Sequence, residues 1–309
     1  MYSERVIITG SSGVIGFALN NELKSSGYSD VISLSSLDVD LRNEEDTYKL
    51  FNELKPSLVY HLAARVYGIM GNLQNKGDAY LENVRINTNV IDASYRSGAK
   101  KVVAMGSSAV YSDNVPLPMS ENQIWNGAPH YSEAAYAHSK RAMLAQLEAY
   151  HDQYGLDYAF CISTNLYGPN DKFDEKWGHV IPSLISKFYR ANSENKPVSV
   201  WGTGKAKRDF LYSEDAAYAM KLIGEQFTGP INLATGDTHT IRETVELISK
   251  VSAFKGEVIW DETKPDGQHL RDYNISRLRD LGFMPRYDLY EGLSKSYEWF
   301  KVNNQLARR

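Results

Sequence analysis

The first half of the chain alternates short apolar, β-branched runs with segments long enough for amphipathic helices. The apolar runs are Val6–Thr9, Val31–Leu34, Leu58–Leu62, Lys101–Met105 and Tyr158–Ile162. The helical patterns lie between them, over Gly13–Ser26, Glu44–Leu54, Glu82–Ser97 and Tyr136–Tyr154. Continuous apolar strands separated by helices indicate βαβ units and a parallel sheet covered on both faces. Because such crossovers are right-handed, the pattern predicts an α/β fold with a doubly wound parallel Rossmann sheet.

This alternation breaks after about Asn165. The second half has stretches rich in proline, glycine and aromatic residues, such as Leu166–Asn170 and Lys264–Gly267, and two further helical patterns near His179–Asn192 and Ile241–Val251. We expect a nucleotide-binding domain over residues 1–165 and a smaller α/β C-terminal substrate lobe over 166–309. Segments of the lobe are expected to cross back to the first domain.

The composition limits the class of partner. The 34 Lys and Arg residues against 38 Asp and Glu give a net charge of −4, which argues against an extended nucleic-acid-binding surface. A single cysteine excludes an intramolecular disulfide and a Cys-based zinc site, and we expect no metal. No apolar run approaches the roughly 20 residues that span a bilayer. The chain enters the strand-like Arg5–Thr9 without a signal-peptide layout, so we expect a cytoplasmic protein with no membrane partner.

A glycine-rich turn directly follows the first apolar run. The residues are Gly10, Ser11, Ser12, Gly13, Val14, Ile15 and Gly16. Glycines here permit a tight turn, close approach of a pyrophosphate and close packing of helix on sheet, while free N–H groups at the helix start bind phosphates. The strand–turn–helix context predicts a dinucleotide site, and the GxxGxxG spacing is typical of short-chain dehydrogenases/reductases.

The end of the second run bears on the choice of cofactor. An acid at this place binds a ribose 2′-hydroxyl and disfavours a 2′-phosphate. Ser35 and Ser36 stand at the strand end and can donate to a phosphate, although Asp38 is close. We therefore favour NADP over NAD, with NAD as the alternative.

Tyr136 and Lys140 lie four residues apart, on one face of a predicted helix. A neighbouring ammonium favours the phenolate, so the pair can act as acid and base near neutral pH. Ser107 and Ser108 follow the fourth apolar run, at the strand end where doubly wound sheets bind ligands. A serine hydroxyl there can hold a substrate carbonyl beside the tyrosine.

With these residues the chain resembles the extended short-chain dehydrogenases/reductases, and within them the GDP-L-fucose synthases, which are NADPH-dependent 3,5-epimerase-4-reductases of GDP-4-keto-6-deoxymannose. The similarity runs nearly end to end. The matching stretches are Ser35–Leu41, His61–Ala64, Gly106–Ser108, Tyr136 with Lys140, Thr164–Asp171, His179–Pro182, Val200–Gly204, Arg208–Leu211 and Lys264–Gly267.

The resemblance implies a role for each matching residue. Ser107, Tyr136 and Lys140 would form the reductase triad, with Tyr136 protonating the oxygen at carbon 4 and His179 as a further catalytic residue. NADPH would contact Gly10, Ser12, Gly13, Val14, Ile15, Gly16, Ser35, Ser36, Asp40, Leu41, Ala63, Met105, Lys140, Asn165, Leu166 and His179. The GDP-sugar would contact Ser108, Asn165, Lys187, Trp201, Arg208 and Asp266. The family also implies a homodimer through the helices near Glu82–Ser97 and Tyr136–Tyr154.

Three of these positions have a structural alternative. Trp201 can be a core residue after a strand, Arg208 can form a surface ion pair with Asp209, and Lys187 can be a solvated helix residue.

The chain departs from the family at one catalytic position. In GDP-L-fucose synthases a cysteine two residues after the triad serine works with a histidine to epimerise carbons 3 and 5; this chain keeps His179 but has Ala109. A methyl group cannot transfer a proton. The only cysteine, Cys161, lies in an apolar run and is expected to be a core residue.

The sequence therefore predicts a 4-keto reductase of a GDP-4-keto-6-deoxy sugar without efficient epimerisation. The alternatives are a full epimerase–reductase that uses Ser108 or Tyr111 in place of the cysteine, another nucleotide-sugar epimerase or dehydratase, and a non-enzymatic NADP-binding regulator. The stretch Arg65–Met70 places Tyr67 near the expected sugar pocket, which suggests a heptose in place of a hexose.

Overall fold

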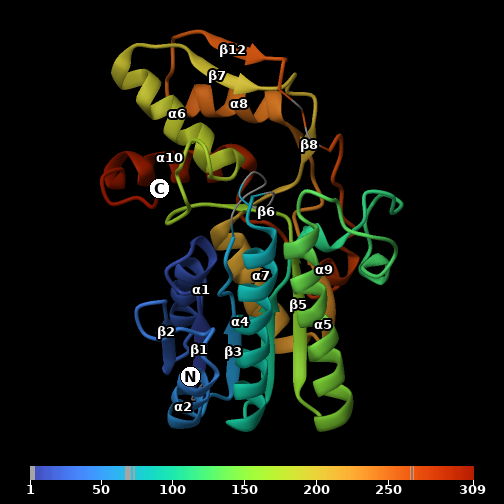
Figure 1. The fold of residues 1–309 in the computed structure, drawn as a ribbon. Coiled ribbons are helices and arrows are strands. Elements are labelled where there is room, and N and C mark those ends of the chain that lie inside the picture. The colour runs from blue at the N-terminus through green and yellow to red at the C-terminus, as the bar shows by residue number, and fades with distance from the viewer. Residues whose placement is uncertain (1–3, 67–70, 72–73, 265, 267) are drawn as a thin grey trace.

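Six strands form one parallel sheet in the order β10-β5-β4-β3-β1-β2 in the computed structural model, which describes residues 4–66, 71, 74–264, 266 and 268–309 (Figure 1). The strand bounds are β1 Val6–Thr9, β2 Val31–Leu34, β3 Leu58–His61, β4 Lys101–Met105, β5 Asp157–Ser163 and β10 Gly229–Leu233. Strand β1 pairs with both β2 and β3. The strand order therefore reverses at β1, and the crevice at the carboxyl ends of β1 and β3 is where such sheets bind ligands.

Helices cover both faces of this sheet. Helices α1 and α7 pack together on one face, and α2, α4 and α5 lie on the other (Figure 1). Their bounds are α1 Val14–Ser25, α2 Glu44–Leu54, α4 Lys76–Arg96, α5 Ala134–Tyr154 and α7 Ser213–Gln226. Because the sheet is enclosed, every residue of β1 and β3 is buried, as the uninterrupted apolar runs predict.

Helix α4 begins earlier than the sequence predicts, at Lys76 and not at Glu82. The first two turns carry exposed Tyr80 and Leu81. Ala79 is buried there. An apolar pattern with so narrow a buried stripe gives a weak helical signal.

The second half of the chain contributes to the first layer as well. Helix α7 packs against α1, and β10 extends the sheet beside β5. Residues 213–233 thus lie with the strands of residues 6–163, while the functional division at residue 165 stays a proposal.

A separate lobe lies beyond the carboxyl ends of the strands (Figure 1). It holds a parallel strand pair, β7 and β12, against three helices, with its own core around Phe188 and Phe300. The bounds are α6 Val180–Glu194, β7 Val198–Trp201, α8 Ile241–Val251, β12 Val258–Asp261 and α10 Leu289–Asn303. The remaining elements are η1 Ser108–Val110, η2 Glu121–Gln123, β6 Asn165–Tyr167, β8 Lys207–Arg208, β9 Phe210–Tyr212, β11 His239–Thr240 and α9 Ser276–Asp280. No helix among the described residues is long and apolar enough to cross a membrane.

Candidate active site

The glycine-rich turn after β1 forms a tight cradle. Gly10 has φ +70°, and a Cβ on it would lie 2.7 Å from the Ala63 nitrogen at the end of β3. A Cβ on Gly16 would collide with the Gly10 carbonyl. The N-cap residue Gly13 has no side chain, and the first turn of α1 contains no acid. The helix N-terminus is therefore open and positive, and the cradle fits the pyrophosphate of a dinucleotide.

The other residues of the turn divide between surface and core. Ser12 is exposed, whereas the side chain of Ile15 is buried and that of Val14 packs against the main core. Ile15 can therefore meet a cofactor only through its backbone, whereas the half-buried Val14 side chain keeps part of its surface open.

The end of β2 contains polar groups that bind one another. The Ser35 hydroxyl and N–H both donate to Asp38 at 2.7 Å, which lowers the pKa of that carboxyl. Asp40 accepts from the Arg42 guanidinium at 2.8 Å, and these hydrogen bonds lower its pKa to about 2. The Leu41 side chain is buried. Exposed Ser36 lines a groove of about 400 Å³ at this strand end.

Tyr136 and Lys140 lie on α5 and are both buried. Lys140 is 1% exposed and donates to the Met105 carbonyl at 2.8 Å, at the end of β4. Its ammonium lies 5.8 Å from the centre of the Tyr136 ring. Burial lowers the pKa of Lys140 to about 7, because an ammonium without water is costly.

Ser107 completes this group. Burial and the nearby Glu133 carboxylate raise the pKa of Tyr136, while a hydrogen bond with Ser107 lowers it. Ser107 itself accepts from the Ala109 N–H at 3.2 Å. The structure thus brings Ser107, Tyr136 and Lys140 together with a tyrosine that stays protonated at neutral pH, as a proton donor requires.

A buried polar chain lies beneath this triad. His61 is 1% exposed and contacts the Thr9 hydroxyl at 2.9 Å and the Asn87 amide at 3.0 Å. Burial, and to a smaller extent the charge of Lys140, lower the pKa of His61 to about 3. His61 is therefore neutral and positions its neighbours without titrating.

The sequence does not identify two charged residues near Ser108, namely Arg271 and Glu133. Arg271 donates to the Ser108 hydroxyl at 3.2 Å and to Glu133 at 3.2 Å. Both partners are more than 130 positions away in sequence. No local pattern signals such a contact.

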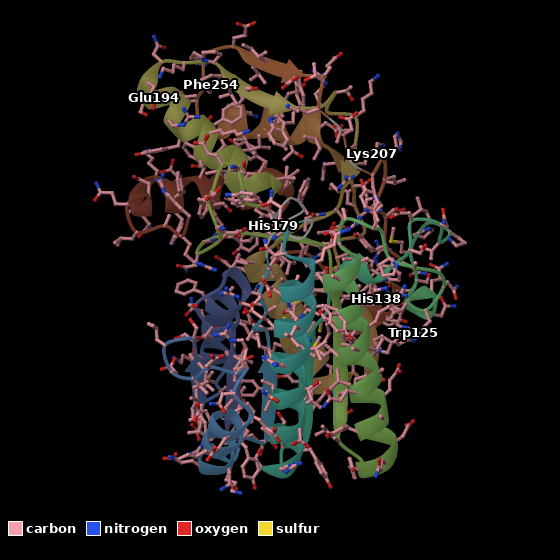
Figure 2. All side chains as sticks on the ribbon, in the orientation of Figure 1. Trp125, His138, His179, Glu194, Lys207 and Phe254 are labelled. Atoms are coloured by element: carbon pink, nitrogen blue, oxygen red, sulfur yellow. The ribbon has the colours of Figure 1, made fainter. Side chains whose placement is uncertain are left out.

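Ala109 and His179 differ in their surroundings. Ala109 is 3% exposed in η1 and packs against Tyr136 and Ala137. His179 is the exposed N-cap residue of α6 and lies where the lobe meets the sheet layer (Figure 2). The Asp171 carboxyl interacts electrostatically with His179. Burial of Asp171 raises the pKa of this carboxyl.

Lys187 and Trp201 line a hollow of about 190 Å³ in the lobe. Trp201 is 55% exposed, so it is not a core residue. The ammonium groups of Lys187 and Lys264 lie 6.0 and 5.8 Å from its ring centre. Lys187 donates to the Ser199 carbonyl at 3.2 Å, and burial lowers its pKa. An exposed indole with two ammonium groups near its ring can hold a base and an anionic group.

Arg208 and Asp209 make no ion pair. Arg208 donates to the carbonyls of Lys207 and Gln268 at 2.7 and 2.6 Å. Asp209 is fully buried and accepts from the N–H groups of Thr235 and Gly236. The ion-pair alternative for Arg208 is therefore wrong.

Asp266 and Asn165 form hydrogen bonds with neighbouring segments of the chain in this structure. Both Asp266 oxygens accept from Thr203, its N–H and its hydroxyl, at 2.6 Å. Asn165 donates to the Asp209 carbonyl at 3.1 Å, and Leu166 packs against the main core. Tyr67 lies outside the described residues.

Cys161 lies in β5 and is fully buried, which raises the pKa of its thiol to about 12. Its prediction as a core residue is confirmed. Among the described residues no group of three or more His, Cys, Asp and Glu side chains could hold a metal ion.

Comparison with known proteins identifies the family of the chain and several similar enzymes. The model of the NAD dependent epimerase/dehydratase family matches residues 6–234. The GDP-L-fucose synthase of Escherichia coli strain K12 is 34% identical over 320 residues, covering 100% of both chains. A GDP-L-fucose synthetase from Naegleria fowleri, solved bound to NADP, is 30% identical with a TM-score of 0.92, covering 100% of this chain and 98% of that chain. A GDP-mannoheptose C4 reductase from Campylobacter jejuni, solved with NADP, is 28% identical with a TM-score of 0.85, covering 97% of this chain and 99% of that chain.

Proposed function

The chain belongs to the NAD dependent epimerase/dehydratase family, and we propose that it is an NADPH-dependent 4-keto reductase of a GDP-linked 4-keto-6-deoxy sugar. The observation that carries the proposal is the contrast within one pocket. Ser107, Tyr136 and Lys140 form a complete proton-donating group, while the neighbouring position 109 holds only a methyl group. The relatives act on GDP-sugars by name, and two neighbours are solved with NADP.

The proposed reaction reduces the ketone at carbon 4 to an alcohol. Bound NADPH supplies the hydride that adds to that carbon. Tyr136 donates its phenolic proton to the oxygen, and its raised pKa ensures that the proton is present before the reaction. Lys140, when protonated, stabilises the phenolate that remains, and Ser107 orients the carbonyl beside the tyrosine.

The nucleotide part of the substrate is proposed to occupy the lobe. Trp201 and Lys187 offer an aromatic face and a cation beside the hollow there. Arg208 adds a guanidinium suited to a diphosphate, and Ser108 with Arg271 would contact the sugar near carbon 4.

The absence of epimerisation is a separate part of the proposal. His179 remains, but Ala109 cannot exchange a proton at carbon 3 or 5. Tyr111 is a poor substitute because its hydroxyl is buried and donates to Asn232 at 2.7 Å, with a pKa raised by burial. Ser108 is an ordinary alcohol that accepts a hydrogen bond from Arg271. The substrate test below distinguishes a hexose from a heptose substrate.

We also propose a homodimer through α4 and α5. Exposed Tyr80, Leu81, Tyr95 and Tyr154 on these helices support it, with Tyr95 and Tyr154 stacked at 4.4 Å. Sedimentation at several concentrations would test this, and a monomer at all of them would refute it.

The activity test follows NADPH consumption with three substrates: GDP-4-keto-6-deoxymannose, the corresponding GDP-4-keto-6-deoxyheptose, and the UDP-linked 4-keto-6-deoxyhexose as the control. We expect turnover with at least one GDP-sugar and little with the UDP-sugar. NADPH that stays unconsumed with both GDP-sugars would refute the proposed reaction, and faster turnover of the UDP-sugar would refute the nucleotide assignment.

A further inference from the structure

The segment after α10 returns to the glycine-rich turn. The carbonyl of Arg308 accepts from the Phe173 N–H at 2.8 Å, and Arg308 pairs with Lys172 as a short parallel bridge. The N–H groups of Leu306 and Ala307 bond to the Asn303 carbonyl at 2.9 Å. Figure 1 shows this end of the chain close to the start of α1. The backbone of Arg308 is therefore held in place by the lobe.

The side chain of Arg308 reaches the other layer of the molecule. Its Nη1 lies 3.9 Å from the position that a Cβ on Gly13 would occupy. Gly13 is the N-cap of α1, in the centre of the cradle. A residue near the end of the chain thus presents its guanidinium to the turn near the beginning.

This placement is electrostatically unfavourable without a further group. The N-terminus of α1 carries the positive end of the helix dipole, so a guanidinium beside it is repelled. Among the described residues the Arg308 guanidinium has no hydrogen bond or ion pair, and it is exposed. A cation held at a positive helix end is stabilised by an anion that both can bind.

The nearest acid does not satisfy this requirement. Asp171 attracts Arg308 electrostatically, but no ion pair joins them. Asp171 uses one oxygen to accept from the Lys172 N–H, and its buried Oδ2 has no hydrogen-bond partner. Asp171 therefore attracts Arg308 toward this side of the turn. The N–H donors of the Arg308 guanidinium stay available for another group.

We propose that Arg308 is a ligand of the cofactor pyrophosphate, opposite the N–H groups of the glycine-rich turn. The inference rests on the dinucleotide site of the proposed function and adds a residue from the far end of the chain to it. An anion between Arg308 and α1 would be bound by both layers, so cofactor binding would tie the segment after α10 to the sheet layer. The 2′-phosphate is not the expected partner, because Ser35 and Ser36, the residues that the sequence assigns to it, stand at the end of β2.

The test measures binding and not turnover. Titration calorimetry of the full chain gives the Kd of NADP⁺ and of adenosine 2′-monophosphate, which lacks the pyrophosphate. We expect R308A to weaken NADP⁺ binding about fivefold to thirtyfold, the range of one charge-assisted contact at a partly solvated site. R308K, which keeps the charge but not the fork, should lose less. Adenosine 2′-monophosphate should bind all variants equally.

The matched control is R309A. Arg309 is the next residue, is exposed, and donates to the Asn304 carbonyl at 3.3 Å within its own segment. Its replacement should leave the Kd of NADP⁺ unchanged within about twofold. Thermal unfolding of the ligand-free variants should match that of the parent chain.

The outcomes separate this inference from the proposed function. A parent chain that does not bind NADP⁺ refutes the proposed function. If the parent binds and R308A binds equally well, the inference is wrong and the proposed function stands. Equal loss of both ligands in R308A, or equal loss in R309A, would also overturn the pyrophosphate assignment.

Discussion

The Tyr136 side and the His179 side of this pocket differ in how many neighbouring residues hold the proton-transfer group in place. On one side Tyr136 is buried, hydrogen-bonded to Ser107 and close to Lys140. The hydrogen-bonded pair of His61 and Asn87 lies beneath this group. On the other side His179 is exposed at a helix start and its expected partner position is Ala109, whose methyl packs against Tyr136. The reductase side is a network that reaches into the core.

This difference explains how an enzyme can keep reduction at carbon 4 and lose epimerisation at carbons 3 and 5. Reduction needs a tyrosine that stays protonated until the reaction and a charged lysine beside it that stabilises the phenolate left behind. Burial raises the pKa of Tyr136 and lowers that of Lys140, so both conditions hold below about pH 7. Epimerisation needs one side chain able to take a proton at position 109. Replacing that side chain by a methyl group removes this step and leaves the buried network intact.

The strongest way to break the reductase side is Y136F. Without the phenolic proton, turnover should fall about a thousandfold or more, the upper part of the range for general acid catalysis. NADP⁺ affinity, measured by calorimetry, should change little. Y131F is the matched control because Tyr131 is 70% exposed in the preceding loop, and it should keep full activity. Normal turnover by Y136F would show that the proton comes from elsewhere.

The opposite side can be rebuilt with A109C. A thiol beside the sugar would provide the missing proton acceptor, so exchange of solvent deuterium into carbon 3 or 5 should rise about a hundredfold above that of the parent chain. Mass spectrometry of the product measures this exchange. A109S, which is polar but not basic, is the control and should show no gain. If A109C also shows none, position 109 is not what separates the two activities.

The pH dependence sharpens the role of Lys140. Its pKa is lowered to about 7, so the ammonium is present below that pH and lost above it. Because only the charged form stabilises the tyrosine phenolate, kcat should fall roughly tenfold as pH rises from 6 to 9, with a midpoint near 7. K140R keeps the charge, so its kcat should lack this fall. A parent profile that is flat across this range would contradict the assignment.

The smallest expected effect lies in the lobe, away from both sides of the pocket. W201A should raise KM for the GDP-sugar about threefold to tenfold with little change in kcat, because the indole would hold the nucleotide in both ground and transition states. Trp125 is similarly exposed at 51% and lies in the segment between η2 and α5, so W125A should leave KM unchanged. A fall in kcat without a change in KM for W201A would instead place Trp201 at the reacting end.

The sequence predicted the parts of the molecule that are local. The strands from β1 to β5 follow from apolar runs, and the glycine-rich turn and the Tyr136–Lys140 pair follow from spacing within a few residues. The contacts of Arg271 with Ser108 and Glu133 join distant parts of the chain, and so does the approach of Arg308 to Gly13. Such pairs depend on how the lobe packs on the sheet, which no short window of residues encodes.

The buried polar groups show the same limit. His61 lies in an apolar run that reads as a strand, and only its contacts with Thr9 and Asn87 identify it as part of the network under Lys140. The pKa values of Lys140 and Tyr136 likewise depend on burial by residues from β4, η1 and α5 together.

The most direct test of the central claim is reduction in deuterium oxide. The parent chain is incubated with NADPH and GDP-4-keto-6-deoxymannose, and NMR locates deuterium in the product while NADPH consumption is followed. We predict that NADPH is consumed and that carbons 3 and 5 carry no deuterium. Deuterium at both carbons would contradict the account, because it would show that a complete epimerase–reductase works without a cysteine at position 109.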